Sequence, residues 1–477
     1  MFKNELSRYK FYLLLIPTLL NFQSLLSQGN PNPSALVDSL ILNEMTDKNL
    51  PGVSTVIVKN GKIVWVESYG YADVDNLVPV EDSTVFMLAS VSKLFTGTVA
   101  MMLHENNVID INENINNYLP WNIEIPGFNS DTITFHQLMT HTSSIKDHWA
   151  TMGNYYNSPD PTITLGDCMY RYFNTNGVDY NSSNNFLTYS PGTFYKYSNM
   201  ASALNGYLVE LATSTPFDQY CNDNLFGPLC MDKTSWFFAD FDSAEVARPH
   251  QFSNGVHVPI NHYGFADYPN GQLRSNVMDL ANFMIAYLNN GNFGAFSLLS
   301  GGTIDEMWTP QIPNLNVDQG INWRKEVLFH DNGSSWLWGH NGGESGISTN
   351  LYLDTTNNIG ICVLANGSGS GLNICDKLYN YSLSANVSSG ISPDCIASDV
   401  LELNDGFSVY PNPTNNVLTL DLAFENKSLL VELYDLTGKL LQRTNSKTIN
   451  LQNYSKGIYL LKIAYGDQLK EMKVVKQ

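Results

Sequence analysis

β-Branched residues gather in short runs in some parts of the chain, and apolar residues recur at helical spacing in others. Residues 53–59 and 62–68 are β-rich and are joined by an Asn-Gly pair, the strongest short signal for a β-hairpin. Strand signal returns at 347–353 and 359–365. Strands at both ends of one long domain predict a single antiparallel sheet whose covering helices come from both ends of the chain.

Helical spacing of apolar residues predicts the helices and a change of character in the middle of the chain. Asn32-Pro33 opens the first expected helix, which has an apolar face made of Leu36, Val37, Leu40, Ile41 and Met45. A second expected helix begins at Ser90 and faces the core with Leu94, Phe95, Val99, Met102 and Leu103. Further helices are expected at residues 135–140, 199–213, 277–288 and 372–383. From about 105 to 330 strand signal is weak and Asn, Gly and Pro are frequent, which predicts a helical, loop-rich insert.

The C-terminal part differs from the rest. A stretch rich in Ser, Ala, Gly and Pro predicts a linker at 389–404. Short alternating segments follow at 417–422, 428–434, 440–444, 459–465 and 469–475. Strands at this spacing predict a small β-sandwich over residues 405–477.

The composition is that of a globular protein with more than one domain. The 477 residues are 43% hydrophobic and 15% charged, and 45 acidic residues outnumber 25 basic ones, for a formal charge of -20. A chain this acidic is a poor binder of polyanions, so nucleic-acid recognition is not expected.

The N-terminus predicts a secretory signal peptide at residues 1–27. Basic residues precede an apolar run at 11–20 that Pro17 interrupts, and Ser27 is a small residue before the expected cleavage point. The run is too short to span a bilayer, and no later run is long enough. The absence of a cysteine at the cleavage point does not favour a lipoprotein anchor. The alternative is an uncleaved N-terminal helix.

Cysteine and histidine spacing predicts no metal site. The six cysteines allow disulfides in an exported chain, and Cys221 and Cys230 are close enough in sequence to pair. Cys362 lies in an apolar strand and is expected to be a buried thiol. No C-x-x-C pair occurs, and a helix would not align His136 with His141.

Candidate chemistry begins with Ser90 and Lys93. A serine at a helix N-terminus lies where amide N–H groups favour a developing negative charge, and a lysine three residues on lies over the same face. A nearby amine can activate a serine hydroxyl as a nucleophile, and S-x-x-K is a signature of penicillin-recognising serine enzymes. The structural alternative is that the Ser90 hydroxyl caps the helix and that Lys93 is a surface charge. The same spacing also recurs at Ser143 and Lys146.

Two further candidates lie downstream. Tyr197-Ser198-Asn199 precedes an apolar helical stretch, and His340 with Gly342 precedes the strand expected at 347–353. Neither pattern is rare in this chain. A tyrosine before a helix is usually a packing residue, and a single histidine is more often structural than catalytic.

Together, and in this order, these motifs resemble those of a known enzyme family. Over about residues 35–385 the chain resembles the class C β-lactamase and penicillin-binding-protein-like serine hydrolase family, with further landmarks at Ile133–Ser143, Tyr189–Thr193 and Gly271–Ser275. The resemblance implies an α+β fold over residues 28–388, with a β-lactamase/transpeptidase-like antiparallel sheet flanked by helices. It implies no cofactor and no metal.

The resemblance also implies roles for individual residues. Ser90 would be the acylated nucleophile, and Lys93 and Tyr197 would share the proton transfers, with an ammonium group stabilising the Tyr197 phenolate. The remaining substrate-binding and oxyanion residues would be Asn199, His340, Gly342 and Gly343, where the backbone N–H groups of Ser90 and Gly343 form an oxyanion hole.

The chain departs from the family pattern at three positions. His340 stands where classical β-lactamases have lysine, so the site lacks a permanent cation for a substrate carboxylate, as in esterases and peptidases of the family. Ser144 and Cys230 occupy positions where the family usually has glycine.

The tail resembles the type IX secretion C-terminal sorting domain. The motifs are Tyr410–Pro413, Tyr434–Lys439 and Lys456–Tyr459. This implies export across a bacterial outer membrane, the secretion machinery as a partner, and a secreted or cell-surface location. The alternative is an ordinary binding β-sandwich.

We therefore expect an exported serine hydrolase that forms an acyl-enzyme at Ser90 with a small-molecule or peptide substrate bearing an ester, amide or peptide bond. A β-lactamase or D-alanyl-D-alanine carboxypeptidase is the alternative within enzymes. A non-catalytic penicillin-binding-like binder or sensor is the alternative outside them. Residues 145–190 contain no pattern that predicts the shape of a substrate pocket.

Overall fold

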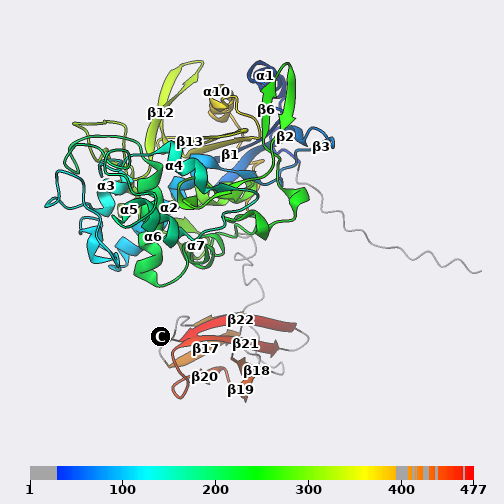
Figure 1. Ribbon diagram of the computed structural model, residues 1–477. Helices are drawn as coiled ribbons and strands as arrows, with labels where there is room; N and C mark the ends of the chain where they lie inside the picture. The colour runs from blue at the N-terminus through cyan, green and yellow to red at the C-terminus, as the bar shows by residue number, and fades with distance from the viewer. Residues whose placement is uncertain are drawn as a thin grey trace, which may run out of the picture.

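The computed structural model describes residues 29–393, 407–410, 414, 416–422, 429–435, 439–465 and 468–476 (Figure 1). The predicted signal peptide at 1–27 and residues 394–404 of the predicted linker lie outside these ranges.

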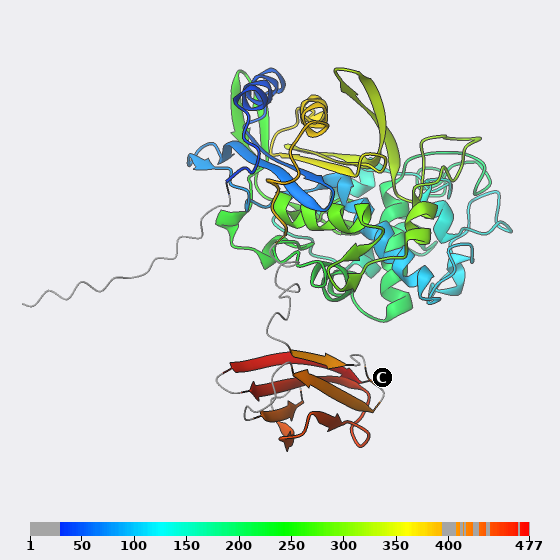
Figure 2. The same cartoon turned by 180° about the vertical axis from the view of Figure 1, so that it is seen from behind.

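A seven-stranded antiparallel sheet is the centre of the first unit (Figures 1 and 2). Its strands, in spatial order, are β12 (Arg324–His330), β13 (Gly333–Glu344), β14 (Ile347–Asp354), β15 (Ile359–Ala365), β1 (Gly52–Lys59), β2 (Lys62–Asp73) and β3 (Val78–Pro79). The two ends of the unit meet where β1 pairs with β15, in a register that runs from Val53 opposite Ala365 to Lys59 opposite Ile359. The predicted single antiparallel sheet is confirmed.

The predicted hairpin at Asn60-Gly61 is also confirmed. Both turn residues have positive φ, at 50° for Asn60 and 74° for Gly61. A two-residue turn of this kind requires φ > 0 at both positions, which Asn and Gly tolerate better than other residues.

Helices from both ends of the chain cover one face of the sheet. In Figure 1, α1 (Ala35–Lys48) and α10 (Leu372–Ser382) lie side by side on this face. The expected start of the first helix was wrong: Ser34 caps it, and Ala35 is its first residue. Leu36 is 71% exposed because only one stripe of a surface helix can face a flat sheet.

The opposite face of the sheet packs on the helical insert. The helix α8 (Val277–Leu288) contacts β1 and β15. The other helices on this side are α2 (Ser92–Glu105), α3 (Phe135–Met139), α4 (Trp149–Met152), α5 (Leu165–Phe173), α6 (Asn199–Thr213), α7 (Phe217–Cys221) and α9 (Gly301–Met307). Short strands connect them: β4 (Phe86–Met87), β5 (Tyr156–Asn157), β6 (His250–Ser253), β7 (Val256–Pro259), β8 (Gly264–Phe265), β9 (Arg274–Ser275), β10 (Asn292–Phe293) and β11 (Phe296–Ser297).

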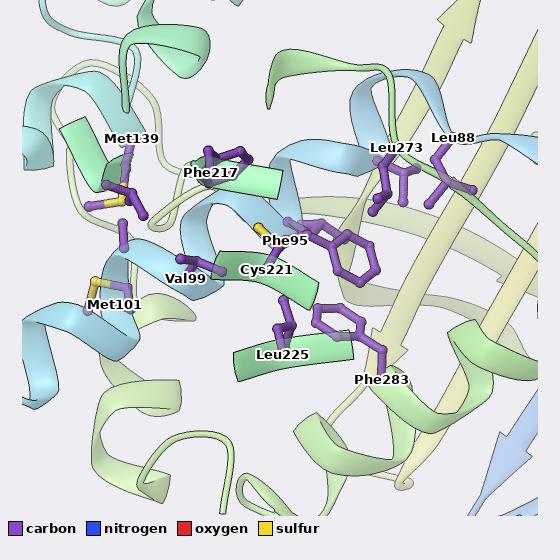
Figure 3. Close-up of a cluster of buried hydrophobic side chains, with 14 of the residues drawn as sticks. Leu88, Phe95, Val99, Met101, Met139, Phe217, Cys221, Leu225, Leu273 and Phe283 are labelled. Carbon is purple, nitrogen blue, oxygen red and sulfur yellow. The ribbon is translucent and has the colours of Figure 1, made fainter. Parts of the chain in front are cut away.

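The helix α2 lies inside this unit. All of its residues from Ser92 to Leu103 are buried. Figure 3 shows its side chains Phe95, Val99 and Met101 among apolar groups from the surrounding elements. The Phe95 ring stacks on Phe283 of α8 with centroids 4.2 Å apart. A helix buried on all sides holds its first turn rigidly, because moving it would open cavities in a close-packed core.

The C-terminal unit is a small β-sandwich, as predicted. One sheet contains β16 (Phe407–Tyr410), β17 (Val417–Leu422) and β20 (Thr448–Asn450), and the other contains β19 (Leu440–Thr444), β18 (Leu429–Tyr434), β21 (Gly457–Tyr465) and β22 (Gln468–Lys476). Leu418 and Leu420 of the first sheet share one hydrophobic core with Val431 and Leu461 of the second.

Of the two expectations for the cysteines, the Cys221–Cys230 disulfide is wrong and the buried Cys362 thiol is confirmed. Cys221 is a buried free thiol, whereas Cys230 is disulfide-bonded, so the two do not pair. Cys362 is a buried thiol in β15, as expected. In the part of the chain that the structure describes, no helix combines the length and apolar character needed to cross a membrane.

Candidate active site

Ser90 lies in a 3₁₀ turn, Ala89–Val91, that leads directly into α2. The α-helical part begins at Ser92, so the expected helix N-terminus is preceded by a tighter turn. Two hydrogen bonds fix the residue before this turn: the Leu88 N–H donates to the Leu273 carbonyl at 2.7 Å, and the Thr349 hydroxyl donates to the Leu88 carbonyl at 2.6 Å. Ala89 has a φ of 47°, a left-handed conformation that costs energy for a residue with a Cβ.

Lys93 points from the first turn of α2 toward Ser90 and is fully buried. Its ammonium donates to the Ser90 Oγ at 3.1 Å, to the Asn199 Oδ1 at 2.8 Å and to the Asn270 carbonyl at 2.6 Å. Burial lowers the pKa of Lys93 to about 7, although nearby carboxylates, Asp147 first among them, oppose this effect. Both the ammonium and the neutral amine form of Lys93 are therefore populated near neutral pH.

Asn199 is the first residue of α6 and connects Lys93 to a carboxylate. Its Nδ2 donates to the Asp147 Oδ2 at 2.9 Å, which orients its oxygen toward Lys93. Asp147 also accepts hydrogen bonds from the backbone N–H groups of Asn199 and Met200 and from the Ser198 hydroxyl. A carboxylate at a helix N-terminus is well placed to accept these otherwise unpaired N–H groups.

Asp147 was not singled out from the sequence. The only local signal is a single acidic residue in the loop after the His141–Ser143 motif, and isolated acidic loop residues are common. Its role as the acceptor at the start of α6 depends on the contact between two loops that are distant in sequence.

Tyr197 lies beside Lys93 and Ser90. The lysine nitrogen is 5.0 Å from the centroid of the tyrosine ring, and the ring of His141 packs against it at 4.4 Å. The Tyr197 hydroxyl is buried and makes no hydrogen bond within 3.5 Å in the described part of the chain, yet Ser90 is close enough to influence its pKa. Burial raises the pKa of Tyr197, so the expected phenolate is disfavoured and the neutral phenol predominates.

The His340 motif precedes the strand expected at 347–353, which is β14, and itself lies within β13, a strand that was not expected from the sequence. Its glycines have low intrinsic strand propensity, and pairing with β14 on one side decides the conformation. His340 is 4% exposed, and its ring centroid is 5.9 Å from that of Tyr197. Burial, followed by the charge of Lys93, lowers the pKa of His340 to about 3, so the imidazole is neutral at pH 7.

The glycines of β13 allow the strand to approach the Ser90 turn. A Cβ on Gly342 would overlap the Leu88 carbonyl and the Thr349 hydroxyl, whereas a Cβ on Gly343 would meet nothing within 4 Å. The pairing of β12 with β13 ends at Gly339, so among the described strands residues 340–344 pair only with β14. Their other edge is on the side where an extended substrate could pair.

The two unusual residues at expected glycine positions both have left-handed backbones. Ser144 has a φ of 60° and Cys230 a φ of 51°. Glycine reaches this region without steric cost, which explains why it is usual there. The fold retains the left-handed conformation at both positions in spite of the side chain.

The structure thus brings Ser90, Lys93, Tyr197, Asn199, His340 and the glycines of β13 together around one point. Comparisons with known proteins identify two families along the chain. A family model described as "Beta-lactamase" matches residues 37–382, and one described as "Secretion system C-terminal sorting domain" matches residues 408–477.

Individual relatives are distant in sequence. "Protein flp" of Staphylococcus aureus (strain MW2) is 27% identical over 333 residues, which is 69% of this chain and 62% of that protein. This chain therefore matches less than two thirds of the relative's length.

Two solved structures share the fold. The octameric penicillin-binding protein homologue from Pyrococcus abyssi superposes with a TM-score of 0.58 at 19% identity, covering 93% of this chain and 96% of that one. A beta-lactamase/D-alanine carboxypeptidase from Pseudomonas syringae superposes with a TM-score of 0.58 at 20% identity, covering 74% and 100%. The expected fold class is thereby confirmed.

Proposed function

This chain belongs to the beta-lactamase family, and from that premise we propose that it is a serine hydrolase in which Ser90 is acylated by an ester, amide or peptide substrate. The observation that carries the proposal is the 3.1 Å contact between the Ser90 Oγ and the Lys93 Nζ, in a site where burial lowers the pKa of the lysine to about 7.

The hydrogen bonds of Lys93 suit a general base. An ammonium has three donors, whereas a neutral amine has two donors and one lone pair. With the amine donating to Asn199 and to the Asn270 carbonyl, its lone pair is left for the hydroxyl proton of Ser90. The amine takes that proton as the Ser90 Oγ forms a bond to the substrate carbonyl carbon.

The tetrahedral intermediate places its charge on the former carbonyl oxygen. We assign the backbone N–H groups of Ser90 and Gly343 as its donors, because β13 approaches the Ser90 turn at Gly342. The phenol of Tyr197 then passes a proton to the leaving group and regains one from Lys93. Water releases the acyl group by the reverse sequence.

The charge state of His340 favours one class of substrate over another. Because burial keeps its imidazole neutral at pH 7, this position supplies no permanent cation for a substrate carboxylate. This favours esters, amides or peptides without a carboxylate at that point over β-lactams and D-alanyl peptides.

A fluorophosphonate probe tests the proposal on the purified protein. We expect it to label the native chain and to leave the Ser90→Ala variant unlabelled. Labelling of neither would support a non-catalytic binder. Turnover of a chromogenic cephalosporin as fast as that of p-nitrophenyl acetate would support the β-lactamase alternative.

The C-terminal match indicates export through the type IX secretion system to the cell surface or the medium. We propose that residues 1–27 act as the signal peptide for the first membrane and residues 405–477 as the sorting signal for the second. Removing residues 405–477 is expected to leave the enzyme inside the outer membrane of the producing cell, as cell fractionation would show.

A further inference from the structure

Asp267 is a buried carboxylic acid that the reaction described above does not use. Its side chain is 1% exposed. Oδ2 accepts a hydrogen bond from the Asn270 Nδ2 at 2.7 Å, whereas Oδ1 is buried and has no hydrogen-bond partner among the described residues. An unpaired buried carboxylate oxygen is costly, so its presence beside a charged site calls for a physical reason.

Asn270 connects this carboxyl group to the catalytic lysine. The Asn270 carbonyl accepts a hydrogen bond from the Lys93 Nζ at 2.6 Å, and its side-chain Nδ2 also donates to the Asp267 carbonyl at 2.6 Å. The turn is fastened to α2 at a second point, where the Thr96 hydroxyl donates to the Pro269 carbonyl at 2.7 Å. Asp267 thereby holds the carbonyl that orients Lys93.

Lys93 is held in the same way from two sides, each time by an asparagine that is itself bonded to a carboxylate. Asp147 holds Asn199, and Asn199 offers an oxygen to Lys93. Asp267 holds Asn270, and Asn270 offers a second oxygen to the same nitrogen. Lys93 is therefore held between two acid–asparagine pairs.

We propose that Asp267 is a positioning residue that acts through Asn270, fixing the direction of the Lys93 amine and stabilising the ammonium that forms when Ser90 gives up its proton. The inference rests on the proposed function, because it assigns Lys93 as the proton acceptor. Both Lys93 and Asp267 are buried, and charge interactions are strong between buried groups. A carboxylate that bonds the residue holding the ammonium therefore stabilises that charge.

Asp267 and Lys93 change their protonation states over the same pH range. Burial raises the pKa of Asp267 to about 7 and lowers that of Lys93 to about 7, and a negative charge on Asp267 raises the pKa of the lysine. Among the described residues, the other titratable groups around this pair are Asp147, Glu344, His141, His340, Tyr156, Tyr172, Cys168 and Tyr197. Groups this close titrate as a coupled system.

The first experiment compares Asp267→Asn with the native protein in the hydrolysis of p-nitrophenyl acetate between pH 5 and 9, with active sites counted by the fluorophosphonate probe. Loss of the carboxylate lowers the pKa of Lys93, so we expect the acid limb of kcat/KM to move to lower pH by about 0.5 or more and the plateau kcat to fall about tenfold. An acid limb at the native position would overturn the proposal.

Asp279→Asn is the matched control. Asp279 is also a buried carboxyl group with a raised pKa, but it bonds Thr234 and the Lys233 N–H near the start of α8. We expect this variant to lower stability and to leave the acid limb in place. If both variants move the limb equally, the effect is general and the proposal fails.

A thermal double-mutant cycle with Lys93→Met separates this inference from the proposed function. If Asp267 acts on Lys93, Asp267→Asn lowers Tm by about 3 °C or more in the native chain at pH 7, where both the ammonium and the carboxylate are populated, but not in the Lys93→Met chain. Additive effects would overturn the inference whether or not the protein hydrolyses esters. If the fluorophosphonate probe does not label the native chain, the proposed function fails and this cycle alone decides the coupling.

Asn270→Ala covers the case in which Asp267→Asn does not fold. It leaves the backbone carbonyl of residue 270 but removes both side-chain hydrogen bonds to Asp267. We expect kcat to fall about tenfold with KM little changed, because only the orientation of the lysine is disturbed. An unchanged kcat would overturn the proposal.

Discussion

Lys93 shows how the surroundings of one side chain decide its chemistry. An amine in water is protonated at neutral pH, whereas desolvation in the fully buried site lowers the pKa of Lys93 to about 7. The neighbouring carboxylates limit this shift, so both forms of the lysine are accessible. A proton acceptor works best when its pKa is near the working pH.

The pH dependence follows from the sign of this shift. Below pH 7 the lysine is an ammonium and cannot accept the Ser90 proton, so we expect kcat/KM to fall about tenfold per pH unit there. Above pH 7 it should be level until another group titrates. The profile is measured with an uncharged ester. A profile that is flat from pH 5 to 9 would contradict Lys93 as the base.

Two tyrosines offer a matched pair of single-atom changes. Tyr197→Phe removes the hydroxyl that faces Ser90, and we expect kcat to fall about 10²–10⁴-fold through lost proton transfer. Tyr195→Phe removes a hydroxyl that donates to the Gln319 Oε1 at 3.3 Å, and we expect a change of less than about threefold. Comparable losses in the two variants would mean that Tyr197 is not part of the proton path.

At the scale of elements, the site depends on how β13 approaches the turn before α2. The strand is held by β14, whose Thr349 hydroxyl also bonds the Leu88 carbonyl. One residue of β14 thus sets the distance between the strand and the Ser90 turn. This closeness requires the absence of a side chain at Gly342.

The two adjacent glycines of β13 test this dependence. In Gly342→Ala the added methyl group would overlap the Leu88 carbonyl, so we expect a loss of about 1–3 kcal/mol in unfolding free energy and about 100-fold in kcat. In Gly343→Ala the methyl group meets no protein atom within 4 Å, so we expect native stability. Chemical denaturation and ester hydrolysis measure both. Equal losses of stability at the two positions would show that the close approach is unimportant.

At the scale of the whole molecule, the chain has separate hydrophobic cores. The clusters of the first unit draw on residues from α1 to Ile391, and the cluster of the C-terminal sandwich contains only residues from 418 onward. Units with their own cores can fold independently. The first unit extends through part of the expected linker, because Ile391 pairs with Ile63 by two backbone hydrogen bonds of 2.9 and 3.0 Å.

This pairing predicts where the first unit can be cut. With the Cys230 disulfide reduced in both proteins, we expect a fragment of residues 29–393 to hydrolyse esters as fast as the full chain and to melt at the same temperature. A fragment ending at 388 loses the Ile391 strand contact and should melt several degrees lower, since a change of about 1 kcal/mol shifts Tm by about 2–4 °C in a domain of moderate size. Identical melting of the two fragments would show that residues 389–393 contribute nothing.

The local elements of this protein could be predicted from the sequence because their causes are local. The Asn-Gly turn of the β1–β2 hairpin needs only two residues that tolerate positive φ. The helix α6 and the strand β15 have the predicted bounds because periodicity and capping are properties of short segments. The order of the motifs also sufficed to indicate the family.

Only the tertiary structure decided how the site works. Glycine-rich β13 is a strand because its neighbours pair with it, and the lowered pKa values of Lys93 and His340 arise from burial by distant segments. Asp147 and Asp267 have no recognisable local pattern, and their positions around one lysine follow from loop packing. Charge and desolvation depend on distance in space, and sequence spacing does not determine that distance.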